Sequence, residues 1–211
     1  MNKIVFIVLT SIIISSCNVK PEEKSEKNSP KSEILNNHSF DSLLTSFNDS
    51  TEVARGQLLY KLVELDNPRI KPLLEKALFD KDEFVQIVAI QSINSNNLKS
   101  SSNKLLQLFN RTDNNTLISN LCRTFEDFNL KEAIPYVKEK TKSKNPMVVY
   151  DCILTLGAIG TESEIPFLKK LTDNKVLPEI YDENGFLSQK AEFTIGELAQ
   201  KSIMKLKKAS R

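Results

Sequence analysis

The feature that most constrains the fold is an apolar pattern that returns about every 31 residues along the chain. In the stretch Asn145–Gly160, apolar residues stand at an anchor position and at four, eight and eleven positions beyond it, which is one face of an α-helix. A fixed period of this size is typical of solenoid proteins, because one helix pair cannot bury its apolar face alone. The anchors are 31, 32, 31 and 47 residues apart, at Ala54, Val85, Leu117, Val148 and Ile195.

Each copy of the pattern is followed by a shorter amphipathic segment, so the predicted unit is two helices and a turn. In the clearest copy, Asn145 can cap the first helix and Pro146 suits its first position. Gly157 and Gly160 mark its predicted end, and a second helix is expected from about Thr161–Ser163. The second helices keep one register through the apolar residues Phe40, Leu43, Leu44 and Phe47, then Ile70, Leu73, Leu74 and Ala77, then Leu105, Leu106 and Phe109, then Ile134 and Val137, and finally Ile165 and Leu168.

Three motifs carry a family resemblance: Asn145-Pro-x-Val148, Cys152-Ile-x-x-Leu156-Gly-x-Ile159-Gly160 and Glu164-Ile-Pro166-Phe-Leu168-x-x-Leu171. They resemble the HEAT repeat, in the short form also found in bilin-lyase-like proteins. The arginine that usually follows the valine is replaced by Gln86, Ile118 or Val149 in successive copies. The resemblance covers about residues 40–208. It implies an all-α, right-handed superhelix of about five helix pairs, like HEAT and armadillo solenoids, that serves as an interaction scaffold.

The first 17 residues resemble a bacterial lipoprotein signal. Lys3 supplies a positive n-region, and the apolar run Ile4–Ile14 is shorter than the roughly 20 residues that span a bilayer. The run ends in Ile14-Ser-Ser-Cys17, which resembles a lipobox, where a diacylglycerol is attached to the cysteine thiol. We therefore expect lipidation at Cys17 and an N-terminal acyl anchor in a membrane, with an ordinary cleaved signal peptide as the alternative. Asn18 in place of aspartate favours the outer membrane of the cell envelope, with a periplasmic or surface-facing domain.

Residues 18–38 are predicted to be a disordered, solvated tether, because they are charged, contain two prolines and offer little to bury. Glu22 and Glu23 also resemble the acidic export tags of some surface-displayed lipoproteins, although a generic spacer is the simpler interpretation. The repeat domain is then expected over residues 39–211.

The longest step between anchors contains an insert at residues 173–189. It includes Asn184-Gly185 between apolar residues, which is a strong β-hairpin signal. The hairpin could bind a partner through Tyr181 and Phe186, or it could cover the last apolar surface or decorate a loop. A long terminal helix is expected over Ser188–Lys208.

Composition argues against several classes of function. The 29 Lys and Arg nearly balance the 27 Asp and Glu, and no basic stripe with interleaved aromatic residues indicates nucleic-acid binding. The only histidine, His38, falls in the predicted tether, so a Ser-His-Asp or Cys-His arrangement is not expected within the repeats. Cys122 and Cys152 are expected to be buried free thiols, with a disulfide as the alternative. We predict no catalytic residue, metal site or cofactor.

These inferences predict a membrane-anchored, non-catalytic, monomeric scaffold that binds a protein or peptide. The resemblance implies that the second helices line the concave face, where residues pointing away from the apolar stripes form the binding surface. Tyr136 carries the most weight because aromatic anchors often dominate interfaces, although it could instead pack against a neighbouring helix. Two alternatives stay open, an enzyme or enzyme subunit resembling bilin-lyase-type HEAT proteins and a structural spacer in the envelope. The predicted surface residues are Lys71, Glu75, Asn103, Gln107, Tyr136 and Lys140.

Overall fold

A computed structural model of the chain describes residues 30–65, 67–181 and 187–209. In this part of the chain, five longer helices contain the five anchors, four shorter helices follow the first four of them, and one helix precedes the series. The longer helices are α2 (Glu52–Glu64), α4 (Glu83–Ser95), α6 (Asn115–Phe128), α8 (Pro146–Ile159) and α10 (Ile195–Ala209). The other α-helices are α1 (Pro30–Asp49), α3 (Ile70–Ala77), α5 (Ser102–Arg111), α7 (Ile134–Lys140) and α9 (Ile165–Lys169), and the strands are β1 (Glu179–Tyr181) and β2 (Leu187–Lys190). Short 3-10 helices lead into α5, α7 and α9, namely η1 (Lys99–Ser101), η2 (Lys131–Ala133) and η3 (Glu162–Glu164).

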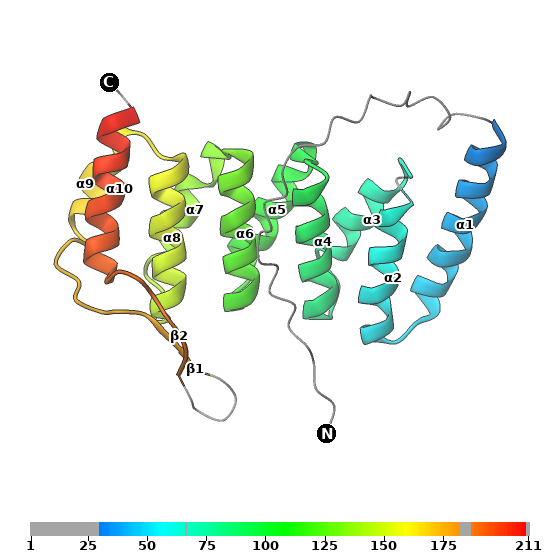
Figure 1. Ribbon diagram of the computed structural model, residues 1–211, viewed down its shortest axis with the longest axis horizontal. Helices are drawn as coiled ribbons and strands as arrows, with labels where there is room; N and C mark the ends of the chain where they lie inside the picture. The colour runs from blue at the N-terminus through cyan, green and yellow to red at the C-terminus, as the bar shows by residue number, and fades with distance from the viewer. Residues whose placement is uncertain (1–29, 66, 182–186, 210–211) are drawn as a thin grey trace, which may run out of the picture.

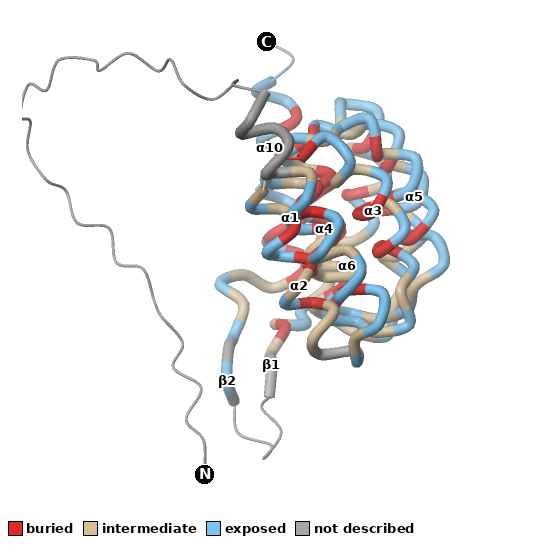
Figure 2. The backbone as a smooth tube through the Cα atoms, turned by 90° about the vertical axis from the view of Figure 1, so that its right-hand side faces the viewer, coloured by how far each residue is buried: buried red, intermediate tan, exposed pale blue. Residues whose placement is uncertain are grey.

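The helices form two layers. In Figure 1, α2, α4, α6, α8 and α10 stand in one row, which we call the first-helix layer, and α3, α5, α7 and α9 lie behind it as the second-helix layer. Figure 2 views the molecule along this row. The two layers lie side by side in that view, and the buried residues lie mostly where the layers meet. The fold is therefore an all-α solenoid, as the repeat pattern predicts.

The predicted apolar faces form the core between the layers. Every anchor from Val85 to Ile195 is at most 3% exposed, and the residues four and eight positions further on are buried as well. Asn96, eleven positions after Val85, is exposed because it is the residue at which α4 ends. Phe109 of α5 and Phe125 of α6 join the two layers, with ring centroids 5.1 Å apart and the rings edge to face.

Small hydroxyl side chains let helices of the first-helix layer pack closely. The position seven residues after the anchor is Ser or Thr in four successive helices, and each of these residues is at most 5% exposed. Thr124 and Thr155 each donate a hydrogen bond to the backbone carbonyl four residues earlier, at 2.9 Å, so burial leaves neither hydroxyl unsatisfied. The four residues are Ser92, Thr124, Thr155 and Ser202.

Gly157 also serves this packing, and it does not mark the end of a helix as predicted. It lies inside α8, and a Cβ placed there would come within 2.8 Å of the Cβ of Ser202 in α10. The helix ends at Gly160, as predicted, and the Gly160 backbone is extended (φ −73°, ψ 178°). The start of α8 is as predicted, since the Asn145 side chain accepts a hydrogen bond from the Met147 N–H at 2.9 Å.

Helix α1 begins nine residues before the predicted folded domain. Residues 30–38 are helical instead of belonging to the tether, and Pro30 suits a first helical position. His38 therefore lies on α1, where it is exposed. The helix packs along α2, and its Asp41 forms an ion pair with Arg69 at 2.8 Å. The predicted lipidation site, Cys17, and residues 18–29 of the predicted tether lie outside the described residues.

The insert forms the predicted hairpin. Strands β1 and β2 pair antiparallel, with Glu179 opposite Lys190, and the two side chains form an ion pair at 2.7 Å. The Asn184-Gly185 turn lies outside the described residues. In Figure 1 the two strands lie below α8, and the chain leads from them back to α9 and α10.

The predicted terminal helix is wrong at its start. Ser188 belongs to β2, which pairs with β1, and the helix begins only at Ile195. A reciprocal cap sets this start, because the Thr194 hydroxyl accepts from the Glu197 N–H at 3.2 Å and the Glu197 carboxylate accepts from the Thr194 N–H at 2.8 Å.

Candidate functional site

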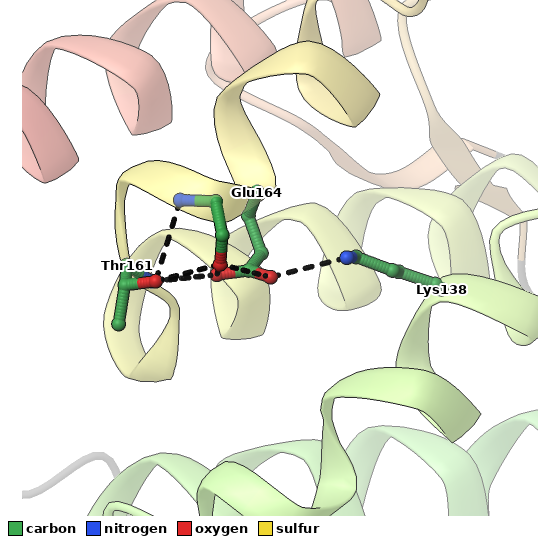
Figure 3. Close-up of polar contacts among 4 residues, drawn as sticks. Lys138, Thr161 and Glu164 are labelled. Carbon is green, nitrogen blue, oxygen red and sulfur yellow. Dashed lines mark hydrogen bonds and ion pairs between the residues drawn. The ribbon is translucent and has the colours of Figure 1, made fainter.

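Neighbouring repeats are joined by a junction between second helices. Lys138 of α7 donates to the Glu164 carboxylate at 3.1 Å, and the Glu164 side chain is only 6% exposed (Figure 3). The same carboxylate accepts from the Thr161 N–H at 2.7 Å and from the Ser163 hydroxyl at 3.0 Å. Glu164 therefore caps the turn that enters α9 and also links α9 to the preceding repeat.

These contacts fix the protonation of the buried carboxyl group. Burial alone would raise the pKa of Glu164, but the hydrogen bonds from the Thr161 backbone, Lys138, Ser163 and the Thr161 hydroxyl together hold that pKa below its ordinary value of 4.5. Glu164 is therefore a carboxylate at neutral pH, with its charge matched by Lys138. The junction is structural, because its polar atoms are occupied by one another.

In the equivalent junction two repeats earlier, a carboxylate is bonded across the repeats to a neutral hydroxyl group. Glu75 corresponds to Lys138 and Ser101 to Glu164, and the Ser101 hydroxyl donates to the Glu75 carboxylate at 2.8 Å. Lys71 pairs with the same carboxylate at 2.7 Å. The lysine and serine hydrogen bonds lower the pKa of Glu75 despite its partial burial. Lys71 and Glu75 are thus occupied within the fold.

A pocket of about 570 Å³ lies between α5 and α7, at the edge where the inter-repeat loops emerge. It combines the exposed ring of Tyr136 with apolar side chains from α5 and α6 and with charged groups from α7 and its following loop. Residues from two successive repeats contribute to it. We call it the α5–α7 pocket, and it is lined by Phe109, Asn110, Asp113, Ile118, Tyr136, Glu139, Lys140, Ser143 and Lys144.

Lys140 is a structural part of this pocket. Its ammonium group donates to the Thr112 carbonyl at 2.5 Å and to the Asp113 carboxylate at 3.1 Å. The repeat equivalent of Lys140, thirty-two residues earlier, is Leu108, which is 4% exposed. A lysine therefore replaces a core leucine here, and its charged end ties α7 to the loop of the preceding repeat.

A second pocket, of about 320 Å³, lies one repeat earlier along the same edge. Each of its five lining residues has its equivalent in the α5–α7 pocket 31 or 32 residues later. The two pockets are therefore the same repeat feature in successive copies, and we call them the loop-edge pockets. The residues of the earlier one, the α3–α5 pocket, are Phe79, Gln86, Leu108, Arg111 and Thr112.

Each loop-edge pocket is lined by an exposed aromatic ring and a cation, which come from different repeat positions in the two pockets, since Phe79 is equivalent to Asn110 and Lys144 to Thr112. Phe79 is 37% exposed, and the Arg111 guanidinium lies 6.0 Å from its ring centroid. In the later pocket, Tyr136 is 38% exposed and Lys144 lines the same space. Exposed aromatic rings beside cations are common contact points for protein partners.

The first-helix layer carries a separate polar cluster between α6 and α8. Ser119 donates to Asp151, and the single Thr155 hydroxyl proton is shared between the Asp151 carbonyl at 2.9 Å and the Glu126 carboxylate at 2.8 Å. Burial raises the pKa of both carboxyl groups, and these hydrogen bonds offset only part of that effect. One oxygen of each carboxyl group is bonded to a hydroxyl of the neighbouring repeat, so the arrangement joins two repeats.

Both cysteines of the repeats are buried and free, as predicted. Cys122 of α6 and Cys152 of α8 are neighbours, and the contact with Cys152, together with burial, raises the pKa of the Cys122 thiol well above 9. A thiol in this state is a poor nucleophile and acts as a small core residue.

The structure brings together only part of the predicted surface. Tyr136 and Lys140 line one pocket, whereas Lys71 and Glu75 pair with each other outside both loop-edge pockets. Asn103 and Gln107 are exposed on α5, also outside these pockets. The side chain of Tyr181 in β1 and the whole of Phe186 lie outside the part of the chain that the structure describes.

Sequence reasoning missed the contribution of the loops. Arg111 is the last residue of α5, and Phe79 and Lys144 follow the ends of α3 and α7, whereas the predicted surface took residues only from helix faces and from the insert. Aligning the loops of successive repeats, and not only their apolar stripes, would have grouped Arg111 and Lys144 at neighbouring repeat positions.

Two further observations limit the chemistry of the described residues. Among them, no group of three or more His, Cys, Asp and Glu side chains is placed to hold a metal ion. None of their helices combines the length and apolar character that a membrane span requires.

A family model of HEAT repeats matches residues 102–180, which run from α5 to the first strand of the hairpin. The match includes the α5–α7 pocket and the Lys138–Glu164 junction. It supports a HEAT-repeat protein, and such repeats commonly mediate protein–protein interactions. No curated protein matches the chain.

Proposed function

We propose that this protein is a lipid-anchored, non-catalytic scaffold of the cell envelope that binds a protein segment along its loop-edge pockets. The observation that carries the proposal is the recurrence of one pocket in two successive repeats, each time with an exposed aromatic ring and a cation. A surface that repeats with the solenoid suits an elongated partner, because each repeat can contact the next part of it.

The pockets are better suited to binding than to turnover. In the α5–α7 pocket, Lys140 is bonded to Asp113 and Glu139 is bonded to Lys142 at 2.7 Å. Among the described residues, the pocket has no histidine or cysteine in its lining. The other titratable groups of the lining, Tyr136 and Lys144, are exposed, whereas general acid–base or nucleophilic catalysis favours a group shielded from water.

The anchor is supported by the sequence alone. The apolar run Ile4–Ile14 and the motif Ile14-Ser-Ser-Cys17 fit lipidation, and an attached lipid would place the solenoid on a membrane. The matching test is to express the full chain with Cys17→Ala and to separate membranes from soluble proteins. Wild type is expected with the membranes and the variant in the soluble fraction, and equal distribution of both would contradict the anchor.

The scaffold function is tested by capture of a partner from cells that express the full chain. Tyr136→Ala removes the exposed ring of the α5–α7 pocket, and Tyr60→Ala is the matched control, because Tyr60 is 42% exposed on α2 in the other layer. We expect a protein recovered with wild type and with the control to be lost with Tyr136→Ala. Loss with the control alone would move the site to the first-helix layer, and capture by both variants would move it to the 173–189 insert or another face of the solenoid. Recovery of no protein even with wild type would favour a spacer.

A further inference from the structure

Two exposed aromatic rings lie together on the first-helix layer. Tyr60 of α2 and Phe84 of α4 are each 42% exposed, with ring centroids 6.4 Å apart and ring planes inclined at 58°. The Phe84 ring lies against Gly56, one helical turn before Tyr60, where a Cβ would overlap it. Glycine destabilises the interior of a helix relative to alanine. The residue that seats this exposed ring is therefore one that α2 itself does not favour.

A chain of uncharged hydrogen bonds runs from these rings across three helices. The Tyr60 hydroxyl donates to the Gln91 side chain of α4 at 3.1 Å, and the Gln91 amide donates to the Asn120 side chain of α6 at 3.1 Å. The Asn120 amide donates to the Thr116 carbonyl at 2.9 Å, so all three side chains are held in place. We call Tyr60, Phe84, Gln91 and Asn120 the aromatic–amide row, and none of them lines a loop-edge pocket.

The aromatic–amide row still offers both donors and acceptors to a ligand. Within the described part of the chain, Gln91 and Asn120 each keep one amide N–H and one lone pair of the amide oxygen unused, and the Tyr60 oxygen can still accept. None of these side chains is charged at neutral pH. A ligand that covers the row must therefore pair neutral donors and neutral acceptors, because a polar group left unpaired on burial weakens binding.

Sugar hydroxyls match this set of groups better than a protein surface does. A hydroxyl is a donor and an acceptor at once, so it can pair with either kind of unused group. A proline-rich segment also contacts exposed rings, but proline has no N–H and its carbonyls only accept. The C–H groups of a sugar ring carry partial positive charge, which suits the negative face of an aromatic ring. A neutral glycan therefore fits both the rings and the amides.

We propose that the aromatic–amide row binds a neutral oligosaccharide, whose sugar rings contact Tyr60 and Phe84 and whose hydroxyls exchange hydrogen bonds with Gln91 and Asn120. The row crosses α2, α4 and α6, and neighbouring packed helices are about 8–10 Å apart, so the site suits a chain of several sugars. The site is separate from the loop-edge pockets and takes a different class of ligand from the proposed protein partner.

The test applies the full chain to an array of neutral oligosaccharides of increasing length, with octaproline as a competing class of ligand. We expect binding to at least one series of oligosaccharides, tighter for its longer members. The affinity should not change as salt is added, because neither the row nor the ligand is charged. Binding to none of the oligosaccharides would overturn the proposal. Binding to octaproline alone would also overturn it and would assign the row to a proline-rich segment.

Two variants test the rings and the amides separately. Tyr60→Ala removes an exposed ring and should weaken binding of the oligosaccharide about tenfold. Gln91→Leu interrupts the hydrogen-bond chain and should weaken it by a similar factor. This variant is expected to fold, because Leu154 is an exposed leucine at the equivalent repeat position of α8. The matched control, Leu154→Gln, makes the reverse change outside the row and should alter the affinity less than about twofold. Equal weakening by Gln91→Leu and Leu154→Gln, or an unchanged affinity of Tyr60→Ala, would overturn the site.

Failure of this site can be told apart from failure of the proposed function. Tyr136→Ala changes the α5–α7 pocket and should leave the affinity for the oligosaccharide unchanged, whereas Tyr60→Ala should leave capture of the protein partner unchanged. If Tyr136→Ala abolishes capture while no oligosaccharide binds, the scaffold stands and the glycan site is wrong. Loss of oligosaccharide binding with Tyr136→Ala instead of Tyr60→Ala would place the ligand in the α5–α7 pocket and would overturn the row.

Discussion

Lys138 and Lys140, two residues apart on α7, form ion pairs in opposite directions along the solenoid. Lys138 reaches forward to Glu164 in the next repeat at 3.1 Å, and Lys140 reaches back to Asp113 of the preceding one at 3.1 Å. The partners differ sharply in burial, since the Glu164 side chain is 6% exposed and the Asp113 side chain is fully exposed. The first pair therefore replaces hydration that Glu164 has lost, whereas the second adds little to what water already provides.

Because of this difference in burial, we expect replacement of Lys138 to lower the free energy of unfolding more than replacement of Lys140. Lys138→Met should lower the free energy of unfolding by about 2 kcal/mol, because it leaves a buried carboxylate without its cation. Lys140→Met should change it by less than about 1 kcal/mol, since Asp113 stays hydrated and an apolar residue suits a position that is Leu108 one repeat earlier. Urea denaturation followed by circular dichroism measures both, and equal costs would contradict the assignment of roles.

Glu164 should make stability depend on pH in the acidic range. Its folded pKa is lowered from 4.5, so the stability that the carboxylate contributes is complete above the unfolded pKa and is lost as the pH falls through the folded value. Glu164→Gln should therefore be less stable than wild type at pH 7, by about 1–2 kcal/mol, and the difference should shrink below about pH 4.5. Denaturation at a series of pH values checks this, and a gap that widens with acid would refute it.

Asp151 should make stability depend on pH in the opposite direction from Glu164. Burial raises its folded pKa above 3.8, so the ionised form costs stability at neutral pH and the cost disappears as the pH falls below the unfolded value. Asp151→Asn keeps an oxygen for the Ser119 hydroxyl and should stabilise the protein at pH 7 by roughly 0.5–1 kcal/mol, with no gain near pH 3. Asp173→Asn, at an exposed position, is the control and should have no such effect.

Gly157→Ala should destabilise the protein, although the same change inside most helices is favourable. The added Cβ would meet the Ser202 hydroxyl at 2.5 Å and the Ser202 Cα at 3.2 Å, so α8 and α10 would have to separate. We expect a loss of about 2 kcal/mol in thermal or urea denaturation. Adding Ser202→Gly should recover part of this loss, and additive effects of the two changes would argue against the contact.

The helix faces were predictable, because burial of one side requires a regular spacing. Val85, Leu117 and Val148 anchor buried stripes as the sequence indicates, and the hairpin signal in the insert is confirmed by its two paired strands. The start of α1 at Pro30 was missed because a charged segment of low hydropathy gives no apolar stripe. The late start of α10 was missed because pairing between β2 and β1 competes with helix formation there.

The candidate site was only partly predictable for a different reason. Tyr136 and Lys140 were selected as exposed positions on α7, but the pocket around them is formed by the ends of three helices and by two loops. Periodicity along one helix carries no information about which loop residues of neighbouring repeats meet. Asp113 and Lys140 meet only because successive repeats stack in register.

The central claim, that a partner protein lies along the loop-edge pockets, is tested most directly by photocrosslinking in living cells. A photoreactive phenylalanine analogue is placed at position 136 or position 60 of the full chain, since Tyr136 and Tyr60 are similarly exposed but lie on different layers. We predict one defined crosslinked protein from position 136 and none from position 60. Crosslinking to that protein from position 60 alone, or equally from both positions, would contradict the account.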